Sequence, residues 1–233
     1  MDAEKNVLPD ACRDCLFKST CNQVAGQENS NFLFVNPIQQ SYKKGEVIMK
    51  QGMKTNHLVY LYKGIVKFNY EDNNNKNLIL SITKAPTLLG LANVLNEDIN
   101  FFSILAIEEC TGCLIDLNKL KMFIMNNRLF MLNIMKMSTG MFRKSIVKII
   151  SMAHKQTVCR IAEILIDLSK NVYQSDAFVL SVSRQEFAEY AGCSKVNVIH
   201  TLQNFAAEGI IKVSGKKIEI LKPEMLIKIS KSE

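Results

Sequence analysis

The chain has 233 residues, of which 48% are hydrophobic and 22% are charged. This balance excludes a mostly disordered chain, and the length allows one large or two small domains with hydrophobic cores. No apolar run approaches the roughly 18 residues that a membrane helix needs, and the first residues contain no apolar signal segment. We therefore expect a soluble, cytoplasmic protein that has no membrane partner.

The net charge is +7, and its distribution along the chain is uneven. Residues 1–127 contain 13 Lys and Arg and 13 Asp and Glu, whereas residues 128–233 contain 16 and 9. The whole positive excess therefore lies in the C-terminal half. A neutral half joined to a basic half favours a sensing part joined to a part that binds a polyanion. On charge alone, a solvated lysine-rich surface is an equal alternative.

A region of short apolar runs separated by turns follows a polar, cysteine-containing segment at 1–31. Within this region Val66, Phe68 and Tyr70 alternate on one face, as they do in a half-buried strand. Many short strands with regular turns predict a small barrel or roll. We assign residues 32–127 to this β-rich sensor domain.

From 129 to 153 the apolar period becomes that of a helix, with no proline and a single glycine. An apolar stripe, broken only by Ser145, consists of Ile134, Met137, Met141, Ile149 and Met152. The flanking positions are also apolar: Met131, Met135, Phe142 and Ile146. A helix that is apolar on several sides must be covered on several sides. We therefore predict a dimerisation helix at 128–155, with a long helix buried inside one monomer as the alternative.

The C-terminal part has the pattern of two short helices joined by a turn. A capping box at Ser183 opens a helix at 184–191. Gly192 then provides a tight turn, and Ser194 is the N-cap of a second helix at 195–208. Two strand-like runs joined by a Ser-Gly-Lys turn follow. This order predicts a helix-turn-helix with a wing, with a generic helical pair as the alternative.

The second helix of this pair has a face suited to reading DNA. Val198, Leu202 and Phe205 share its buried side, and the opposite side presents small, amide and imidazole groups. In a major groove Asn pairs with adenine and apolar groups meet thymine methyls. The residues expected on base edges are Val196, Asn197, Ile199, His200 and Asn204. The residues expected on phosphates are Arg184, Ser194, Lys195, Lys216 and Lys217.

Several of these runs resemble the Crp/Fnr family of transcriptional regulators. The matching positions are 183–187, 192–195 and Phe205 in the helix pair, 209–211 just after it, 42–48 and 61–67 in the roll, and Arg160, Ile161 and Ala162 after the long helix. The resemblance implies an α+β fold with an N-terminal cyclic-nucleotide-binding-like β-roll, a long dimerisation helix and a winged helix-turn-helix at 156–233. It also implies a homodimer that binds near-palindromic double-stranded DNA and contacts RNA polymerase.

The sequence departs from this family in the recognition helix. Well-known members carry a Glu and an Arg at the positions of Val196 and His200, and this chain has neither charge there. The family's usual DNA target sequence is therefore not expected for this protein.

The roll also lacks the residues that hold a cyclic nucleotide in the family. Those relatives use a Gly-Glu pair and an Arg-Ser pair, but here Gly90 is followed by Leu91 and the second pair falls near 100–101. The chain contains no arginine between Arg13 and Arg128. A cyclic phosphate in this roll would lack its charge-assisted partner, so cyclic AMP is not expected as a ligand.

Three of the seven cysteines, Cys12, Cys15 and Cys21, lie within ten residues of each other in the polar N-terminal segment. Such a group can hold one iron–sulfur cluster or one zinc ion if a fourth ligand comes from elsewhere. The spacing resembles that of the oxygen-sensing Fnr branch. This resemblance implies a [4Fe-4S] cluster with Cys113 as the fourth ligand and Cys110 as its substitute. Zinc, a thiol switch and no cofactor are the alternatives.

The three histidines are far apart in the sequence, and none neighbours a plausible nucleophile, so we expect no enzyme. The predicted function is a sequence-specific DNA-binding transcriptional regulator that senses oxygen or redox state through a cysteine-ligated cluster. One alternative is the same regulator without a cluster, controlled by another small molecule or by a zinc or thiol switch. Another is a regulatory or scaffold module that does not bind DNA.

Overall fold

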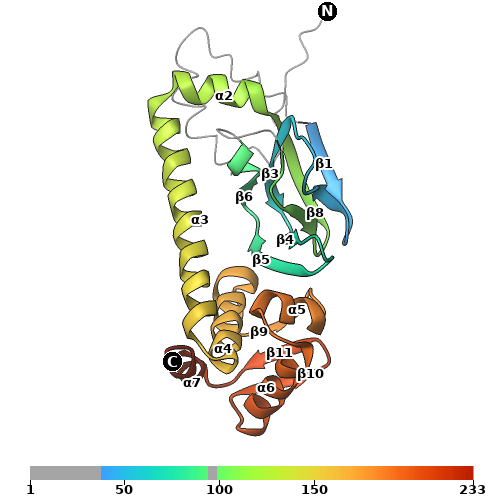
Figure 1. Ribbon diagram of the computed structural model, residues 1–233, viewed down its shortest axis with the longest axis vertical. Helices are drawn as coiled ribbons and strands as arrows, with labels where there is room; N and C mark the ends of the chain where they lie inside the picture. The colour runs from blue at the N-terminus through green and yellow to red at the C-terminus, as the bar shows by residue number, and fades with distance from the viewer. Residues whose placement is uncertain (1–37, 94–98, 233) are drawn as a thin grey trace, which may run out of the picture.

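The computed structural model of the protein describes residues 38–93 and 99–232. A roll of β-strands is followed by a long helix and then by a small helical domain with its own sheet (Figure 1). This architecture confirms the fold class that the sequence predicts. The cysteine-containing segment predicted at 1–31 lies outside the described residues. No helix in the described part of the chain is long and apolar enough to cross a membrane.

The strands of the roll form two four-stranded antiparallel sheets among the described residues, in the orders β1-β8-β3-β6 and β2-β7-β4-β5. The strands are β1 (Ile38–Tyr42), β2 (Val47–Met49), β3 (His57–Lys63), β4 (Ile65–Glu71), β5 (Asn77–Lys84), β6 (Thr87–Leu89), β7 (Ser103–Ala106) and β8 (Cys110–Asp116). A short 3-10 helix, η3 (Leu91–Asn93), follows β6.

Alternating apolar side chains fill the space between the two sheets. Leu61 of β3 and Val66 and Phe68 of β4 are buried in one cluster, as the period of two in the sequence predicts. Gly64 turns the chain from β3 into β4 with a φ of +104°. A Cβ at this position would lie 2.5 Å from the Sγ atom of Cys110. Both the backbone conformation and the close contact therefore require glycine here.

Two helices, α2 (Leu117–Asn126) and α3 (Arg128–His154), follow the roll. The side chain of Asn127 caps α3 by accepting a hydrogen bond from the backbone of Phe130. In its first half α3 packs on the roll, where Phe130 and Ile134 are buried in the same cluster as Leu58. The predicted dimerisation stripe was therefore wrong in this half, because Ile134 lies against the protein's own roll.

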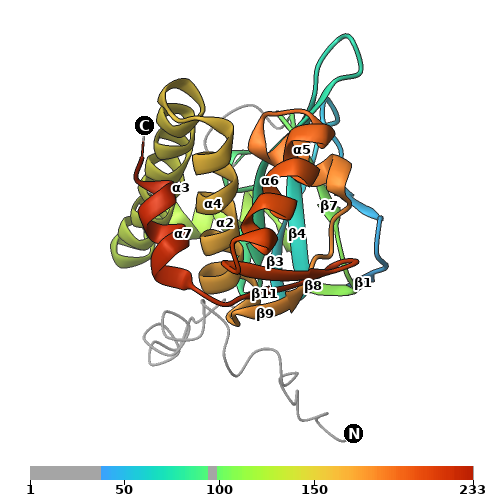
Figure 2. The ribbon, with the colours of Figure 1, turned by 90° about the horizontal axis from the view of Figure 1, so that it is seen from below.

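The C-terminal domain has the predicted helix-turn-helix and wing. Its elements are α4 (Thr157–Asp167), the π-helical turn η4 (Leu168–Tyr173), β9 (Ala177–Val179), α5 (Arg184–Ala191), α6 (Lys195–Ala207), β10 (Ile211–Ser214), β11 (Lys217–Ile220) and α7 (Pro223–Ser230). The capping box at Ser183 is present, and Gly192 ends α5 with a φ of +61°. In Figure 2, α4 lies between α7 and the α5–α6 pair, and it contacts all three helices.

The C-terminal domain packs against the roll through one continuous apolar cluster. Ile79 and Ile82 of β5 are buried together with Tyr190 of α5. At the margin of this contact, Lys67 of β4 donates a 2.6 Å hydrogen bond to Glu186 of α5. The first helix of the helix-turn-helix is thus held on the roll, and α6 lies on the far side of it (Figure 1).

Candidate nucleic-acid interface

The exposed face of α6 contains all five residues that were predicted to lie on base edges. Val196 is 72% exposed, and Asn197, Ile199, His200 and Asn204 are also exposed. The opposite face packs into the domain core, where the predicted residues are buried: Val198, Leu202 and Phe205. The burial of the two faces therefore confirms the helical phase that was read from the sequence.

Two of these exposed side chains lie together one helical turn apart. The Nδ2 atom of Asn204 is 3.4 Å from the Nδ1 atom of His200. The hydroxyl of Ser194 caps the start of α6 by accepting a hydrogen bond from the backbone of Asn197. The N-terminal half of α6 thus presents amide, imidazole and apolar groups, which is the mixture that direct base readout in a major groove requires.

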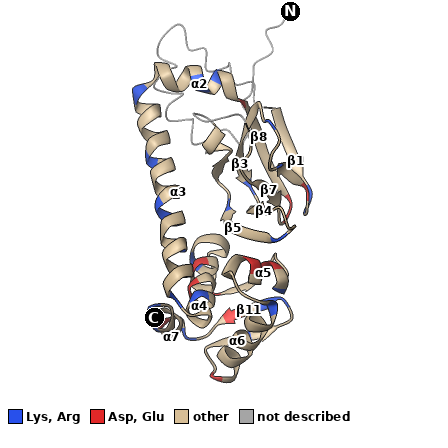
Figure 3. Cartoon of the chain, viewed as in Figure 1, with Lys and Arg blue, Asp and Glu red and all other residues tan. Residues whose placement is uncertain are grey.

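The wing lies beside α6 and adds positive charge to this surface. Lys195 at the start of α6 and Lys216 and Lys217 at the hairpin are exposed. Figure 3 shows Lys and Arg positions beside β11 and Asp and Glu positions on α5. Exposed lysines that flank a base-reading helix are suited to contact phosphates.

Arg184 has a role in the structure that the sequence did not predict. Its Nη2 atom donates a 2.8 Å hydrogen bond to the carbonyl oxygen of Gly215 in the wing turn. Burial lowers the pKa of the guanidinium, and the side chain is only partly exposed. Arg184 therefore joins the start of α5 to the wing and sets the distance between these two parts of the surface.

Arg160 at the start of α4 joins three segments and was not predicted as a site residue. Its guanidinium donates to the carbonyl oxygens of Lys155 at 3.0 Å and Ala191 at 3.0 Å, and more weakly to those of Met152 and Gly192. These carbonyls belong to the end of the long helix and to the turn between α5 and α6. The resemblance included Arg160, but a single arginine gives no sequence signal for such a set of contacts.

The two cysteines of the roll point to opposite faces of β8. Cys110 faces the interior of the roll, where its thiol donates to the carbonyl oxygen of Ile65 at 3.3 Å. Burial, and then the charge of Glu108, raise the pKa of this thiol. Residues three apart in a strand lie on opposite faces, so Cys113 lies on the other side, together with Ile115. Cys113 is 7% exposed.

The other predicted cluster ligands cannot be placed in this structure. Cys12, Cys15 and Cys21 lie outside the described residues. Within the ranges 38–93 and 99–232, no three His, Cys, Asp or Glu residues are close enough to hold a metal ion. Cys113 nevertheless lies near the point where the chain enters the roll, because its strand β8 pairs with β1, the first described strand.

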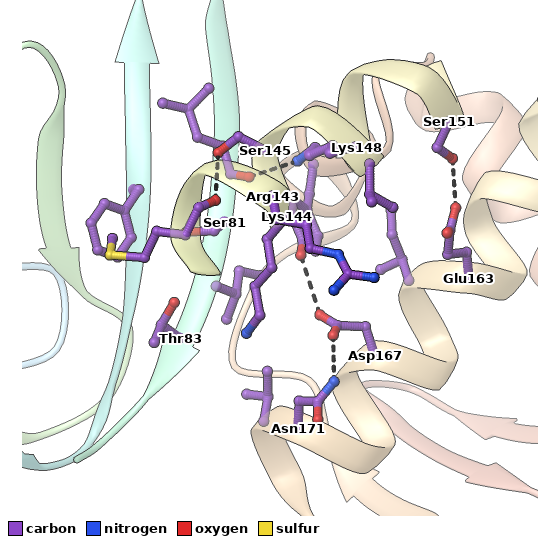
Figure 4. A pocket seen from close by; sticks show the side chains of 18 of the residues that line it. Ser81, Thr83, Arg143, Lys144, Ser145, Lys148, Ser151, Glu163, Asp167 and Asn171 are labelled. Atoms are coloured by element: carbon purple, nitrogen blue, oxygen red, sulfur yellow. Dashed lines mark hydrogen bonds between the residues drawn. The ribbon is translucent and has the colours of Figure 1, made fainter. Parts of the chain in front are cut away.

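A cavity of about 850 Å³ lies between β5, the middle of α3 and the helices of the C-terminal domain (Figure 4). Its polar side chains are contributed by all three parts of the chain. They include Ser81 and Thr83 from β5, Arg143, Lys144 and Ser145 from α3, and Glu163, Asp167 and Asn171 from α4 and η4. The sequence pattern gave no indication of this cavity, because it exists only where the two domains meet.

Two family models match the chain, one for each of its domains. Residues 39–127 match the cyclic nucleotide-binding domain, and residues 159–229 match the Crp-like helix-turn-helix domain. The cAMP-activated global transcriptional regulator CRP of Salmonella typhimurium is 26% identical over 186 residues, which cover 77% of this chain and 87% of that protein. The transcriptional activator protein Anr of Pseudomonas protegens is 24% identical over 188 residues, covering 79% and 77%.

The fold is also found in solved structures. The structure of FixK2 from Bradyrhizobium japonicum matches with a TM-score of 0.77 and 17% identity, and the match covers 84% of this chain and 98% of that one. The c-di-GMP responsive global regulator CLP of Xanthomonas campestris matches with a TM-score of 0.71 and 20% identity, covering 87% and 98%. The order of roll, long helix and winged domain is therefore a known architecture.

Proposed function

The chain belongs to the Crp/Fnr family of transcriptional regulators, and we propose that it reads a near-palindromic operator as a homodimer and contacts RNA polymerase there. The exposed face of α6 is the observation that supports this proposal best. Val196, Asn197 and His200 are available to base edges, and the wing lysines are available to the flanking phosphates.

A test of base readout separates specific from non-specific contacts. His200→Ala and Asn197→Ala should each change the preference among operator sequences by about 1–3 kcal/mol, whereas Lys216→Ala should weaken binding to all sequences about equally. Binding of the wild type and the three variants to a selected operator and to random duplexes gives the measurement. If the wild type binds both duplexes equally at every salt concentration, the chain is a regulatory module that does not read DNA sequence.

The proposed homodimer interface is a stripe on the outer side of α3, in which Met131, Met135, Phe142 and Ile149 are interrupted by Ser138 and Ser145. Positions 131, 135, 138, 142, 145 and 149 alternate in steps of four and three, which is the spacing of a coiled-coil seam. Phe142 is 67% exposed and Ile149 is 60% exposed in the single chain. A second copy of α3 would cover this stripe around a two-fold axis.

For the signal, we propose an iron–sulfur cluster held by Cys12, Cys15, Cys21 and Cys113. The position of Cys113 supports this choice over Cys110, because Cys110 points into the roll and donates to a backbone carbonyl. Thiolates are the usual ligands of such clusters, and a bound cluster would join the N-terminal segment to β8. The roll would then respond to oxygen through the bond between these two parts.

Anaerobic purification tests the cluster. The wild type should contain about four irons per chain, show broad absorbance near ~400 nm and lose its colour in air. Cys113→Ser should lose most of this iron, while Cys110→Ser should keep it. Colourless anaerobic protein without iron after attempted reconstitution would end this part of the proposal and leave DNA binding untouched. If the protein contains zinc instead of iron, a structural zinc site that joins the N-terminal segment to β8 would be supported in place of the cluster.

A small-molecule effector is the second candidate signal, and the cavity between the domains favours it. Cyclic AMP is not the proposed effector, because Leu91 occupies the position of the expected acidic residue and is buried with Leu58 and Leu88. Adding cyclic AMP should therefore leave the thermal unfolding temperature and the operator affinity of the protein unchanged. A rise in either quantity with cyclic AMP concentration would show that the protein binds it and would contradict this expectation.

A further inference from the structure

Lys148 connects three elements at the place where the roll meets the helix-turn-helix. Its Nζ atom donates to the carbonyl oxygens of Ile79 at 2.7 Å and Leu80 at 3.0 Å on β5. The same Nζ atom lies 3.9 Å from the centre of the Tyr190 ring on α5. We call these four residues the Lys148 junction. Lys148 lies in the sequence next to Ile149 of the predicted dimer stripe, but its side chain is directed inward, toward the protein's own domains (Figure 4).

The backbone of β5 has carbonyl groups in positions from which they can accept hydrogen bonds from this amine. β5 is the edge strand of its sheet, so the carbonyl groups on its outer side have no neighbouring strand. The pairing with β4 shifts at this point, where Phe68 faces Ser81 and Asn69 faces Ile79, and Leu80 has no partner. Such a β-bulge breaks the alternation of the ladder. Two consecutive carbonyl groups can therefore accept from one amine.

Tyr190 is the residue of the C-terminal domain that contacts the Lys148 amine. Its ring is buried, and its hydroxyl donates to the Oδ2 atom of Asp167 on α4 at 3.5 Å. The amine can direct an N–H toward the aromatic face whether or not it is protonated, and the protonated form adds a cation–π attraction that grows when the pair is shielded from water. The amine therefore holds α5 against both α3 and β5, one helix away from the surface that meets DNA.

The other polar contacts between the two domains lie nearer the surface. Lys67 reaches Glu186, Lys44 reaches the carbonyl oxygen of Ser181 at 3.3 Å, and Lys84 reaches Gln174 at 3.1 Å. Burial opposes ionisation of Glu186, but hydrogen bonds from Lys67 and Ser183 lower its pKa. The contacts of Lys44 and Lys84 are exposed, and exposed contacts of this kind contribute little and exchange with water. The Lys67–Glu186 pair is partly buried, as Lys148 is, but it joins β4 to α5 only. Lys148 differs from these contacts in that one amine joins α3, β5 and α5.

From this geometry we infer that Lys148 is a positioning residue for DNA binding, which holds the helix-turn-helix in a fixed place relative to the long helix. The base-reading face of α6 stays open in this arrangement, since Val196 and Asn197 are exposed and α6 lies on the side of α5 that is remote from the roll (Figure 1). Fixing the two reading helices of a dimer lowers the entropy lost when both half-sites are bound together. The inference rests on the proposed function and adds the means by which the roll and α3 control it.

The Lys148 junction lies at the wall of the cavity described above, so a molecule bound in the cavity could change its contacts. Lys148, Tyr190 and Asp167 line the cavity, so a displacement of β5 or a molecule bound beside α3 acts on the same contacts. A change in the roll would therefore reach the recognition helix by moving or breaking the Lys148 junction.

Hydrogen–deuterium exchange of the full-length protein tests the junction without DNA. Lys148→Met keeps the length of the side chain but removes the donor, and Lys136→Met on the exposed side of α3 is the matched control. We expect faster exchange in 77–84 and 184–191 for Lys148→Met only, with the roll interior unchanged. Tyr190→Leu should produce the same pattern, and the double variant should be no worse than the worse single variant. Unchanged exchange in Lys148→Met or Tyr190→Leu, or strictly additive effects, would overturn the inference.

Operator binding tests the positioning role. Lys148→Met should bind a two-half-site duplex at least roughly tenfold more weakly than the wild type and a single half-site within about threefold. An equal loss on both duplexes, or no loss, would show that Lys148 acts only on stability or not at all. If the wild type binds neither duplex, the proposed function fails, and the exchange experiment still decides whether the junction exists.

Discussion

The face on which each side chain of this protein lies follows from the repeat of its strand or helix. Cys110 and Cys113 are three positions apart on β8, and the period of two sends them to opposite faces. Lys148 on α3 lies on the side that faces β5, while Phe142, six positions earlier, lies on the outer side. Residues that are close in the sequence of one strand or helix therefore have different environments, because each face of the element contacts a different part of the protein.

The ionisation of Lys148 gives a prediction about stability and pH. Burial lowers the pKa of its amine from 10.5 to about 7, and the charge of Asp167 acts in the opposite direction. Between these two values the unfolded chain binds the proton and the folded chain does not, so the free energy of unfolding rises with pH. Tyr190, the other titratable group at the amine, has its pKa raised by burial and so stays neutral over this range.

Urea unfolding at pH 7 and pH 9 measures this effect. The wild type should gain stability between these pH values relative to Lys148→Met, which has no group to titrate at this position. Groups common to both proteins cancel in the comparison. Equal pH dependence in the two proteins would show that the Lys148 amine is as well solvated as a surface lysine.

Among the elements, α3 has two apolar sides with different partners. Ile134 and Phe130 are buried against the roll, and the stripe that contains Phe142 and Ile149 is exposed in the single chain. The steps of four and three along the outer stripe keep it on one side of a coiled helix. The inner side holds the helix on its own domain, so the outer side is free for a second subunit.

A charge on the outer stripe should separate the subunits. Phe142→Glu places two like charges at the proposed two-fold axis and removes buried aromatic area, so the dimer should dissociate while the monomer stays folded. Lys136→Glu, on α3 but outside the stripe, should leave the dimer intact. Sedimentation velocity measures both variants, and a Phe142→Glu protein as dimeric as the wild type would place the interface elsewhere.

For the whole molecule, the positive excess of the C-terminal half is carried mainly by the long helix. Residues 128–155, which contain α3, hold six Lys and Arg and no Asp or Glu, whereas residues 156–233 hold ten and nine. The lysines of the wing and of α6 that flank the candidate base-reading face are exposed. The acidic residues of α5 lie on the side of the roll, where Glu186 meets Lys67. The winged domain is therefore nearly neutral as a whole, and its exposed lysines Lys195, Lys216 and Lys217 are local to the candidate DNA surface.

This charge arrangement predicts a steep dependence of DNA affinity on salt. The logarithm of the association constant should fall linearly with the logarithm of salt concentration, by about 0.9 for each phosphate contact. Lys216→Ala should make the slope shallower by about one, and Lys136→Ala should leave it unchanged. Fluorescence anisotropy from low to physiological salt measures these slopes, and an affinity independent of salt would argue against phosphate contacts by the wing.

Local signals in the sequence determined the elements and much of the candidate DNA surface. The capping box at Ser183, the turn at Gly192 and the N-cap at Ser194 define the two helices through contacts within a few residues. The burial of Val198 and exposure of Val196 likewise follow from the helical period alone. Such features are predictable because the atoms involved are close in the chain.

Only the tertiary structure decided the features that join distant segments. The sequence showed that α3 is apolar on several sides, but not that Ile134 meets the roll while Phe142 stays exposed. It also gave no indication that Lys148 reaches carbonyl groups 68 and 69 positions away, or that Arg184 bonds the wing turn. The apolar period of a helix shows that an apolar side must be buried. Which element buries that side depends on packing between elements far apart in the chain.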